Sequence, residues 1–393
     1  MTSPVSSQLP SMLYAEAEEE LRKAVRALLA DRSPLPAVLA RTESGEPYDT
    51  GLWQALAGEI GCGGLLIGEE QGGAGASYRE AAVVAEETGR AAAPVPFLGS
   101  AVIATAALLP TGDELLPGLA DGSVTAALAV PFAQPPPAAV PGAPLETGVR
   151  IGPARDGDPA GTARLSGTVA GVADAQPATV LLVPADGVPF GLYAVDPAAP
   201  GVTVTPVSSL DQSRQLADLS FDDALGRAVA TGEEAAHALS AALTAGAAIL
   251  ASEQLGIAER CLEMTVAYVK ERHQFGRPVG SFQALKHRLA EVWVGVTQAR
   301  AAARYAAACL AEGSPDARVA VALAKSACGE VAVLAAQECV QLHGGIGFTW
   351  EHPAHLLLKR AKSGSLALGT PDRHRAVLAQ LVDLPPAPAA LGD

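Results

Sequence analysis

Apolar side chains recur at helical spacing in the first third of the chain. Between residues 14 and 30, Leu21, Ala24, Val25 and Leu28 follow the i, i+3, i+4, i+7 pattern that places them on one face of a helix. Similar patterns predict two further helices, at 51–60 and 77–93. We therefore expect an N-terminal all-α domain over residues 1–122.

The pattern changes after residue 122 to short apolar runs. These runs occupy residues 180–183, 191–195 and 202–204. Turn residues such as Pro184, Gly187 and Gly201 separate them, and this alternation of short apolar runs and turns is typical of strands. The sequence therefore predicts a small central β domain over residues 123–230.

Long helical patterns return in the last part of the chain. The stretch 247–272 places Leu255, Leu262, Val266 and Val269 along one stripe. Two more long helices are expected, at 282–307 and 317–342. Long helices with apolar stripes predict a C-terminal four-helix bundle over residues 231–393. The expected fold class is thus α+β multidomain, with a β domain between two helical ones.

Composition and charge restrict the classes of partner. A net charge of -15 over 393 residues argues against binding to nucleic acid or to an anionic membrane surface. No apolar stretch reaches about 18 residues without Gly, Pro or charge, and no signal peptide is visible, so we expect a cytoplasmic protein. The five cysteines form no C-x-x-C pair, which fits buried thiols in a reducing compartment.

Three sequence blocks carry candidate chemistry. The first reads EEQGGAG at 69–75 and continues with EETGR at 86–90; the second reads RHQFGRPV at 272–279; the third reads QLHGGIGFTWEH at 341–352. Each has an ordinary structural explanation, since Arg272 at a helix end favours the helix dipole and Gly344 with Gly345 can end a helix. We expect the first block only to shape the N-terminal domain.

Taken together and in this order, the blocks resemble the acyl-CoA dehydrogenase family, and the match covers nearly the whole chain. The resemblance implies the all-α, all-β, all-α fold and a flavin, FAD, that takes a hydride from an acyl-CoA thioester while a carboxylate removes a proton. It also implies that the second and third blocks contact a flavin held mainly by a neighbouring subunit. The expected FAD contacts are Arg272, Gln274, Phe275, Gln341, Gly344, Gly345 and Thr370.

The chain departs from the family at the groups that serve a subunit's own active site. Where the family carries its catalytic glutamate, the sequence Ala367-Leu368-Gly369-Thr370 has Leu368. The family's flavin loops correspond to Ala127–Pro135 and Gly171–Ala175, which lack the expected acidic, hydroxyl and aromatic residues. An alternative base position, at 244–248, has no carboxylate. Leucine cannot abstract a proton, so the chain is expected to have no base of its own.

The chain keeps the blocks that contact a neighbour's flavin but lacks the groups of its own active site. In this it resembles the base-less subunit of heteromeric acyl-CoA dehydrogenases of bacterial sterol side-chain degradation. The resemblance implies a hetero-oligomer in lipid and steroid metabolism, in which the chain completes the FAD site of a catalytically intact acyl-CoA dehydrogenase subunit. An acyl-CoA thioester substrate and an electron-transfer acceptor are implied as further partners.

Two alternatives remain open at this point. The chain could be an active homomeric enzyme with a relocated base, for which Glu253 is the candidate, or a flavin-free scaffold subunit. His343, His352 and His355 also lie close in sequence, but their spacing matches no known ligand set, so no metal is expected.

Overall fold

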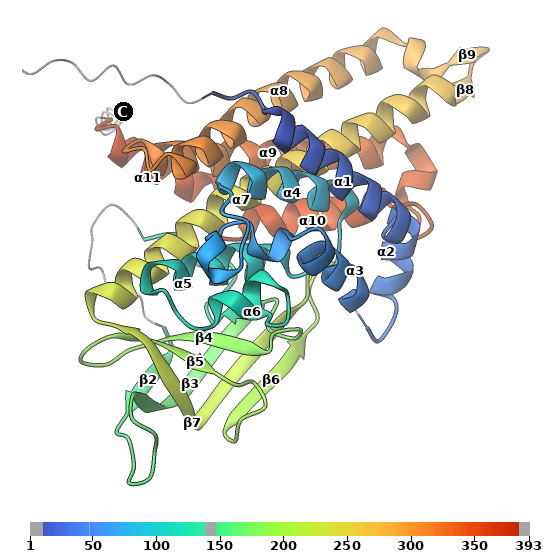
Figure 1. Ribbon diagram of the computed structural model, residues 1–393. Helices are drawn as coiled ribbons and strands as arrows, with labels where there is room; N and C mark the ends of the chain where they lie inside the picture. Colours follow the sequence, from blue (N-terminus) through green and yellow to red (C-terminus); the bar gives the residue numbers. More distant parts are fainter. Residues whose placement is uncertain (1–10, 47, 138–146, 385–393) are drawn as a thin grey trace, which may run out of the picture.

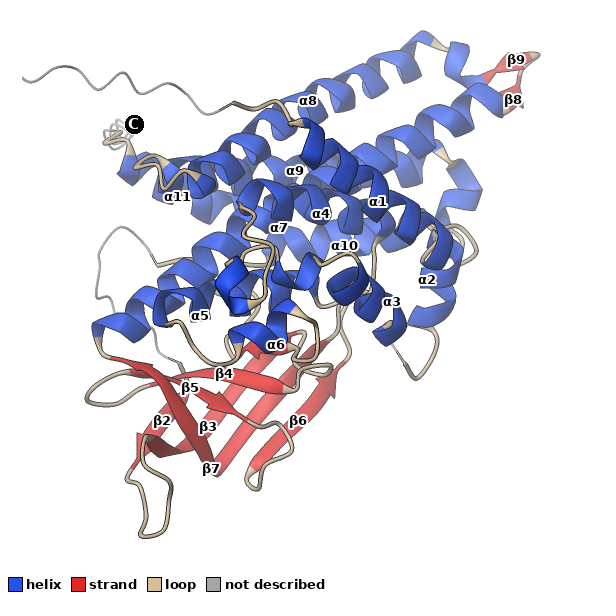
Figure 2. Ribbon diagram, viewed as in Figure 1, coloured by secondary structure: helices blue, strands red, loops and turns tan. Residues whose placement is uncertain are grey.

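The computed structural model describes residues 11–46, 48–137 and 147–384, and Figures 1 and 2 show helices from both ends of the sequence lying above a sheet at the bottom of the view. The N-terminal helices are α1 (Glu16–Arg32), α2 (Leu35–Thr42), α3 (Thr50–Gln54), α4 (Tyr78–Ala91), α5 (Thr105–Leu108) and α6 (Leu116–Ala120). Ser77 caps α4, because its side chain accepts a hydrogen bond from the backbone N–H of Arg79, while the Glu80 carboxylate accepts one from the backbone N–H of Ser77.

Two segments of this part form π-helix, at Ala55–Glu59 and Phe97–Ala104. Short 3-10 turns occupy Cys62–Gly64, Glu69–Gln71 and Leu109–Thr111. The π-helical segment at 97–104 is buried along its whole length, which explains why it shows no amphipathic pattern in the sequence.

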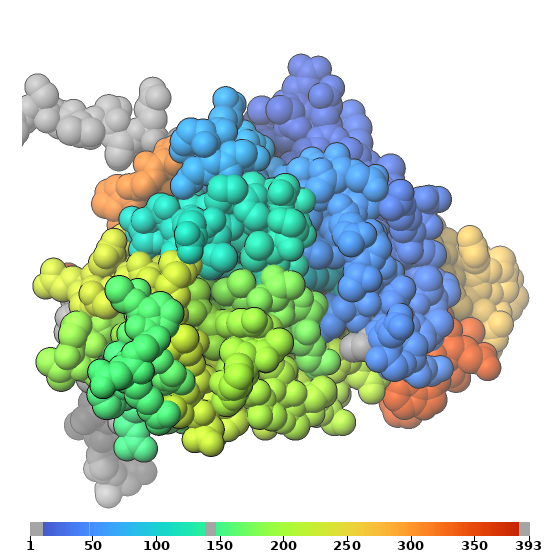
Figure 3. All heavy atoms as spheres, turned by 60° about the horizontal axis from the view of Figure 1, so that its bottom comes forward, coloured from blue at the N-terminus to red at the C-terminus, as the bar shows by residue number. Residues whose placement is uncertain are grey.

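Seven strands form the sheet, namely β1 (Ala126–Leu128), β2 (Val149–Gly152), β3 (Thr162–Ala173), β4 (Val180–Ala185), β5 (Gly191–Val195), β6 (Val202–Val207) and β7 (Leu216–Thr231). They lie in the order β1-β4-β5-β7-β3-β2, and β6 also pairs with β7. Among the strand pairs of the described residues, β1–β4 is parallel and the others are antiparallel, and one isolated parallel bridge joins Arg150 to Asp186. Figure 3, viewed from the sheet side, shows the N-terminal helices lying directly against the strands.

The C-terminal helices are α7 (Glu233–Glu271), α8 (Gln283–Ala311), α9 (Ala317–Leu342), α10 (Ala354–Leu366) and α11 (Pro371–Leu381). Helix α9 packs against α7, α8, α10 and α11, and α4 from the N-terminal part packs against α7. A small hairpin, β8 (His273–Gln274) and β9 (Arg277–Pro278), joins α7 to α8 through a 3-10 turn at Val279–Ser281. Figure 1 shows α7 running from the sheet to this hairpin at the far end of the molecule.

The order of helices, strands and helices confirms the predicted fold class. The helix expected at 317–342 is observed with those bounds, whereas the one expected at 247–272 is the second half of the much longer α7. The domain limits 1–122, 123–230 and 231–393 stay a prediction, because the positions of helices and strands do not by themselves define domains.

Helices α7 and α9 are long and apolar enough to cross a membrane. However, 72% and 61% of their most apolar windows are buried inside the fold, and core helices pass the same test of length and composition. Their apolar character is therefore explained by packing against the rest of the protein.

Candidate functional site

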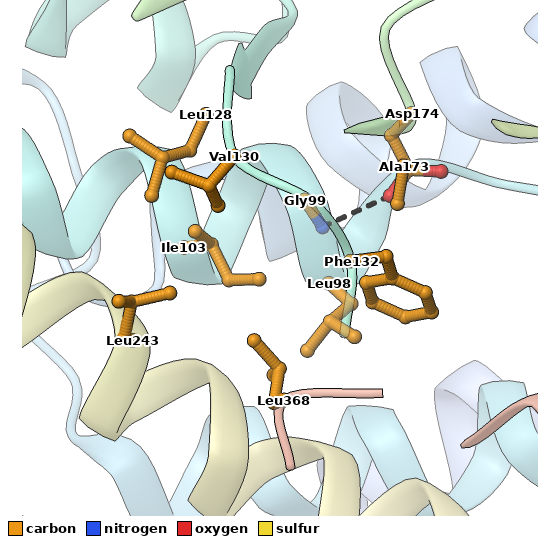
Figure 4. A pocket seen from close by; sticks show the side chains of 10 residues that line it. All are labelled: Leu98, Gly99, Ile103, Leu128, Val130, Phe132, Ala173, Asp174, Leu243 and Leu368. Atoms are coloured by element: carbon orange, nitrogen blue, oxygen red, sulfur yellow. Dashed lines mark hydrogen bonds between the residues drawn. The ribbon is translucent and has the colours of Figure 1, made fainter. Parts of the chain in front are cut away.

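Leu368, which the sequence aligns with the expected base, lies in a small apolar pocket. Figure 4 shows its side chain facing those of Leu98, Ile103, Phe132 and Leu243, which come from all three parts of the chain. The pocket is lined by Leu98, Gly99, Ile103, Leu128, Val130, Phe132, Ala173, Asp174, Leu243 and Leu368. Its volume is about 20 Å³, room for about one water molecule. The residues here do not fit a flavin ring with an acyl chain.

The backbone around Leu368 is held firmly although the side chain has no acid–base chemistry. Leu368 adopts a left-handed conformation, with φ at 52°, and donates its N–H to the carbonyl oxygen of Phe132 at 2.7 Å. Its own carbonyl oxygen accepts a hydrogen bond from Nε2 of the buried His374 at 2.8 Å. The buried ammonium of Lys325 donates to the carbonyl oxygen of Gly369 at 3.3 Å.

Burial governs the charge of both side chains that hold this loop. It lowers the pKa of His374 to about 4, so the ring is neutral near pH 7 and its N–H remains a donor. Burial also lowers the pKa of Lys325 to about 7. The loop that carries Leu368 is therefore held in place by hydrogen bonds from two buried side chains.

Asp174 closes one side of the same pocket. Its Oδ1 accepts a hydrogen bond from the Tyr48 hydroxyl at 3.0 Å, and its Oδ2 accepts one from the backbone N–H of Gly99 at 3.1 Å. These bonds join the strand end after β3 to the N-terminal helices, and burial raises the pKa of Asp174. No local sequence pattern predicts these contacts, because the partners of Asp174 are 75 and 126 residues away.

Glu253 belongs to a buried ion-pair network rather than to the pocket. Its Oε2 lies 2.6 Å from Nη2 of Arg214, and its Oε1 lies 3.0 Å from Nε of Arg360. Burial alone would raise the pKa of Glu253, but the two guanidinium groups outweigh it and hold the pKa at about 2. With both oxygens engaged and so low a pKa, Glu253 is unsuited to act as a general base, which disfavours its assignment as a relocated one.

The second sequence block forms an exposed hairpin at the end of α7. Arg272 and Gln274 are exposed, and Phe275 at the tip is 88% exposed with φ at 54°. Gly276 follows with φ at 77°, a conformation that glycine adopts without steric cost. The backbone N–H of Arg272 donates to the carbonyl oxygen of Tyr268 at 2.9 Å, which ties the hairpin to the last turn of α7. The hairpin thus presents two arginine cations, one amide and the rings of His273 and Phe275 outward, because Arg277 and His273 are exposed as well.

The third block forms a turn at the end of α9, the 3-10 segment Gly344–Phe348. Gln341, Gly344 and Gly345 are exposed, and a Cβ atom added at either glycine would meet no atom within 4 Å. Gly344 has φ at 62°. The backbone here is open to close approach by another molecule, as a dinucleotide contact requires.

An aromatic stack joins the third block to α7, four residues before Arg272. The rings of Tyr268 and His343 are stacked with centroids 4.4 Å apart, and the His352 ring lies 4.4 Å from His343 on a tilt of 44°. Sequence reasoning missed this contact, for which the regular spacing of side chains along α7 and α9 gives no sign. Within the described ranges, no group of three or more His, Cys, Asp or Glu residues could hold a metal ion. The expectation of no metal stays a prediction.

Thr370 lies apart from both blocks. It precedes α11, and its Oγ1 accepts a hydrogen bond from the backbone N–H of Arg373 at 3.4 Å, so it is the N-cap of that helix. The structure therefore brings the FAD-contact candidates of blocks two and three together at one end, and keeps Thr370 with the Leu368 loop.

Comparison with known proteins identifies the family of the two outer helical regions. The family descriptions "Acyl-CoA dehydrogenase, N-terminal domain" and "Acyl-CoA dehydrogenase, C-terminal domain" match residues 15–122 and 236–382. The chain belongs to the acyl-CoA dehydrogenase family. It is an oxidoreductase chain of that family, and its two outer helical regions are the parts that the family descriptions recognise.

Among acyl-CoA dehydrogenases of known name, the chain is similar to IpdE2 of Mycobacterium tuberculosis, with 36% identity over 94% of this chain and 98% of that one. It is similarly related to IpdE2 of Mycolicibacterium smegmatis, at 35% identity over 91% and 96%. Among solved structures, a variant of the Tcur3481-Tcur3483 steroid acyl-CoA dehydrogenase has a TM-score of 0.81 at 31% identity, covering 94% of this chain and 98% of that one. The ChsE4-ChsE5 complex of Mycobacterium tuberculosis has a TM-score of 0.82 at 27% identity, covering 96% and 100%.

Proposed function

We propose that this chain is the base-less subunit of a heteromeric, FAD-dependent acyl-CoA dehydrogenase and that it completes the FAD site of a catalytically intact partner subunit. The observation that carries the proposal is the contrast between the two ends of α7. At one end the chain's own pocket contains Leu368 and has a volume of about 20 Å³. At the other end the family's flavin-contacting residues are exposed.

The exposed surface suits a flavin held by another chain. Arg272 offers a planar fork of N–H groups that can bind two diphosphate oxygens at once. Gln274 and Gln341 offer amide donors and acceptors, while Gly344 and Gly345 allow backbone to approach closely. FAD, when bound, would accept the hydride from the acyl thioester. This chain's residues would bind and orient its adenosine diphosphate end and would move no proton.

The substrate class follows from the relatives. One similar structure is described as a steroid acyl-CoA dehydrogenase, and both solved assemblies named above contain two kinds of chain. We therefore propose desaturation of a steroid-derived acyl-CoA thioester in the cytoplasm, with an electron-transfer protein as the acceptor. The hydride would reach the flavin in the partner's active site, where an intact carboxylate removes the α-proton.

The experiment is a comparison of the chain purified alone and with its co-expressed partner subunit. We expect the lone chain to carry no flavin and to show no acyl-CoA oxidation, and the complex to carry one FAD per pair of chains. One flavin per subunit, with turnover by the lone chain, would overturn the proposal. A colourless but stable complex without flavin absorbance would favour the flavin-free scaffold instead.

A homomeric enzyme with Glu253 as its base is the second candidate. The ion pairs of Glu253 with Arg214 and Arg360 count against it, because a base must give up such contacts to receive a proton. Turnover by the lone chain that is lost in the Glu253→Gln variant, with the variant's stability unchanged, would be the result in its favour.

A further inference from the structure

The turn of the third block meets the last part of α7, just before the hairpin, at one buried ring. His343 is 3% exposed and lies directly before the Gly344–Phe348 turn. One face of its ring stacks on Tyr268, the residue whose carbonyl oxygen holds the backbone N–H of Arg272. His352, which closes the segment after the turn, lies against His343 as well. The His343 ring thus contacts both Tyr268, at the end of α7 before the hairpin, and His352, which follows the turn.

The orientation of this ring is fixed by the end of α9. Nδ1 of His343 lies 2.6 Å from the carbonyl oxygen of Cys339, so this nitrogen carries the proton and donates. The turn folds back tightly over the same residue. A Cβ atom added at Gly347 would lie 2.5 Å from the carbonyl oxygen of Val340 and 2.8 Å from Cβ of His343. The turn therefore passes so close to Val340 and to the start of the His343 side chain that it requires glycine at 347.

We propose that His343 is a positioning residue for flavin binding: its ring, between Tyr268 and His352, sets the separation between the Arg272 hairpin and the Gly344–Gly345 backbone. This inference rests on the proposed function, since it concerns the same surface. His343 itself touches no flavin atom in this proposal and acts through the two blocks it spaces.

The physical reason is preorganisation. A diphosphate that is bound by a guanidinium on one segment and by open backbone on another requires both to be at a fixed distance before the ligand arrives. The hairpin and the turn are exposed and lie about 70 residues apart in sequence. Without the ring between them, each could move independently, and part of the binding free energy would be lost in ordering them.

The test uses the complex with the co-expressed partner, stripped of flavin and titrated with FAD while flavin fluorescence is followed. We expect His343→Ala to weaken FAD binding about tenfold, which corresponds to about 1.4 kcal/mol. His343→Phe keeps a flat ring between Tyr268 and His352, and we expect it to restore most of the affinity. His355→Ala is the matched control, because that ring contacts Trp350 outside the stack and should leave FAD affinity unchanged.

A role limited to fold stability would lower the unfolding midpoint of the two His343 variants without separating them in FAD affinity, and that result would overturn the inference. If His343→Ala fails to fold, His352→Ala removes the outer ring of the stack instead. Unchanged FAD affinity in that variant would also overturn it.

Arg272→Ala, measured beside these variants, separates this inference from the proposed function. Weaker FAD binding in Arg272→Ala with no change in His343→Ala would reject the positioning role and leave the proposed function standing. No change in either variant would reject the proposed function, and the inference with it.

Discussion

The Glu253 carboxylate lies 2.6 Å from the Arg214 guanidinium in the buried interior, and it engages Arg360 with its other oxygen. Removing the charge in Glu253→Gln leaves two buried cations short of their counter-ion. We expect a loss of about 3–5 kcal/mol in the free energy of unfolding, the usual cost of breaking a buried pair by removing one partner. Chemical denaturation of the complex measures it, and an unchanged midpoint would contradict the structural role.

The same pair predicts a pH dependence. The folded-state pKa of Glu253 is depressed to about 2 from an ordinary value of 4.5. Its contribution to stability is therefore fully present above about pH 4.5 and is lost as the pH falls toward 2. The difference in unfolding free energy between the wild type and Glu253→Gln should shrink over that window. A difference that stays constant down to pH 3 would argue against the assignment.

Arg272→Ala should release FAD while the two kinds of subunit stay associated. A charge-assisted contact is worth about 1.5–3 kcal/mol, which corresponds to about a 10- to 100-fold loss of FAD affinity. Absorbance of bound flavin after gel filtration measures occupancy. Arg155→Ala, an exposed arginine paired with Asp223 at the opposite, sheet-bearing end, is the control. Full occupancy in Arg272→Ala at unchanged affinity would contradict the flavin contact.

Leu368→Glu should not create a working active site. The new carboxylate would enter a pocket of about 20 Å³ lined almost entirely by apolar side chains, where neither flavin nor thioester fits. We expect no acyl-CoA oxidation by the variant chain alone and a lower unfolding free energy than that of Leu368→Gln, its uncharged counterpart. Measurable desaturation by the lone Leu368→Glu chain would show that the pocket can open.

Because of Lys325, the free energy of unfolding should increase as the pH rises above about 7. Burial lowers its folded-state pKa to about 7 from 10.5, so between these values the unfolded chain binds more protons than the folded one. Stability then rises with pH by at most about 1.4 kcal/mol per unit over this window. The wild type should gain stability relative to Lys325→Met between pH 7 and 9. Parallel profiles for the two proteins would mean that Lys325 stays charged.

The sequence predicted the elements whose side chains follow a regular period. Helix α9 shows its apolar stripe over its full length, and β5 was expected with its observed bounds. The longest strands, β3 and β7, were missed. Both contain glycine or alanine at several positions, and β3 has register shifts near Gly167 that break the two-residue alternation.

The candidate site also contains residues that a local pattern predicts and contacts that it does not. Leu368 and the exposed blocks could be proposed from the sequence because each stands in a contiguous motif, and their roles stay predictions. The contacts of Asp174 with Tyr48 and of Tyr268 with His343 join residues that are 75 or more positions apart, so no local sequence pattern predicts them. The role of Glu253 also depended on its two arginine partners, which only the fold brings together.

Helix α7 reaches from the apolar pocket, which it lines with Leu243, to the turn of Tyr268 below the hairpin. At the standard rise of 1.5 Å per residue, these two positions are about 37 Å apart along the helix. Substitutions in the apolar pocket and in the hairpin therefore share no contacts, and their effects on the free energy of unfolding should add.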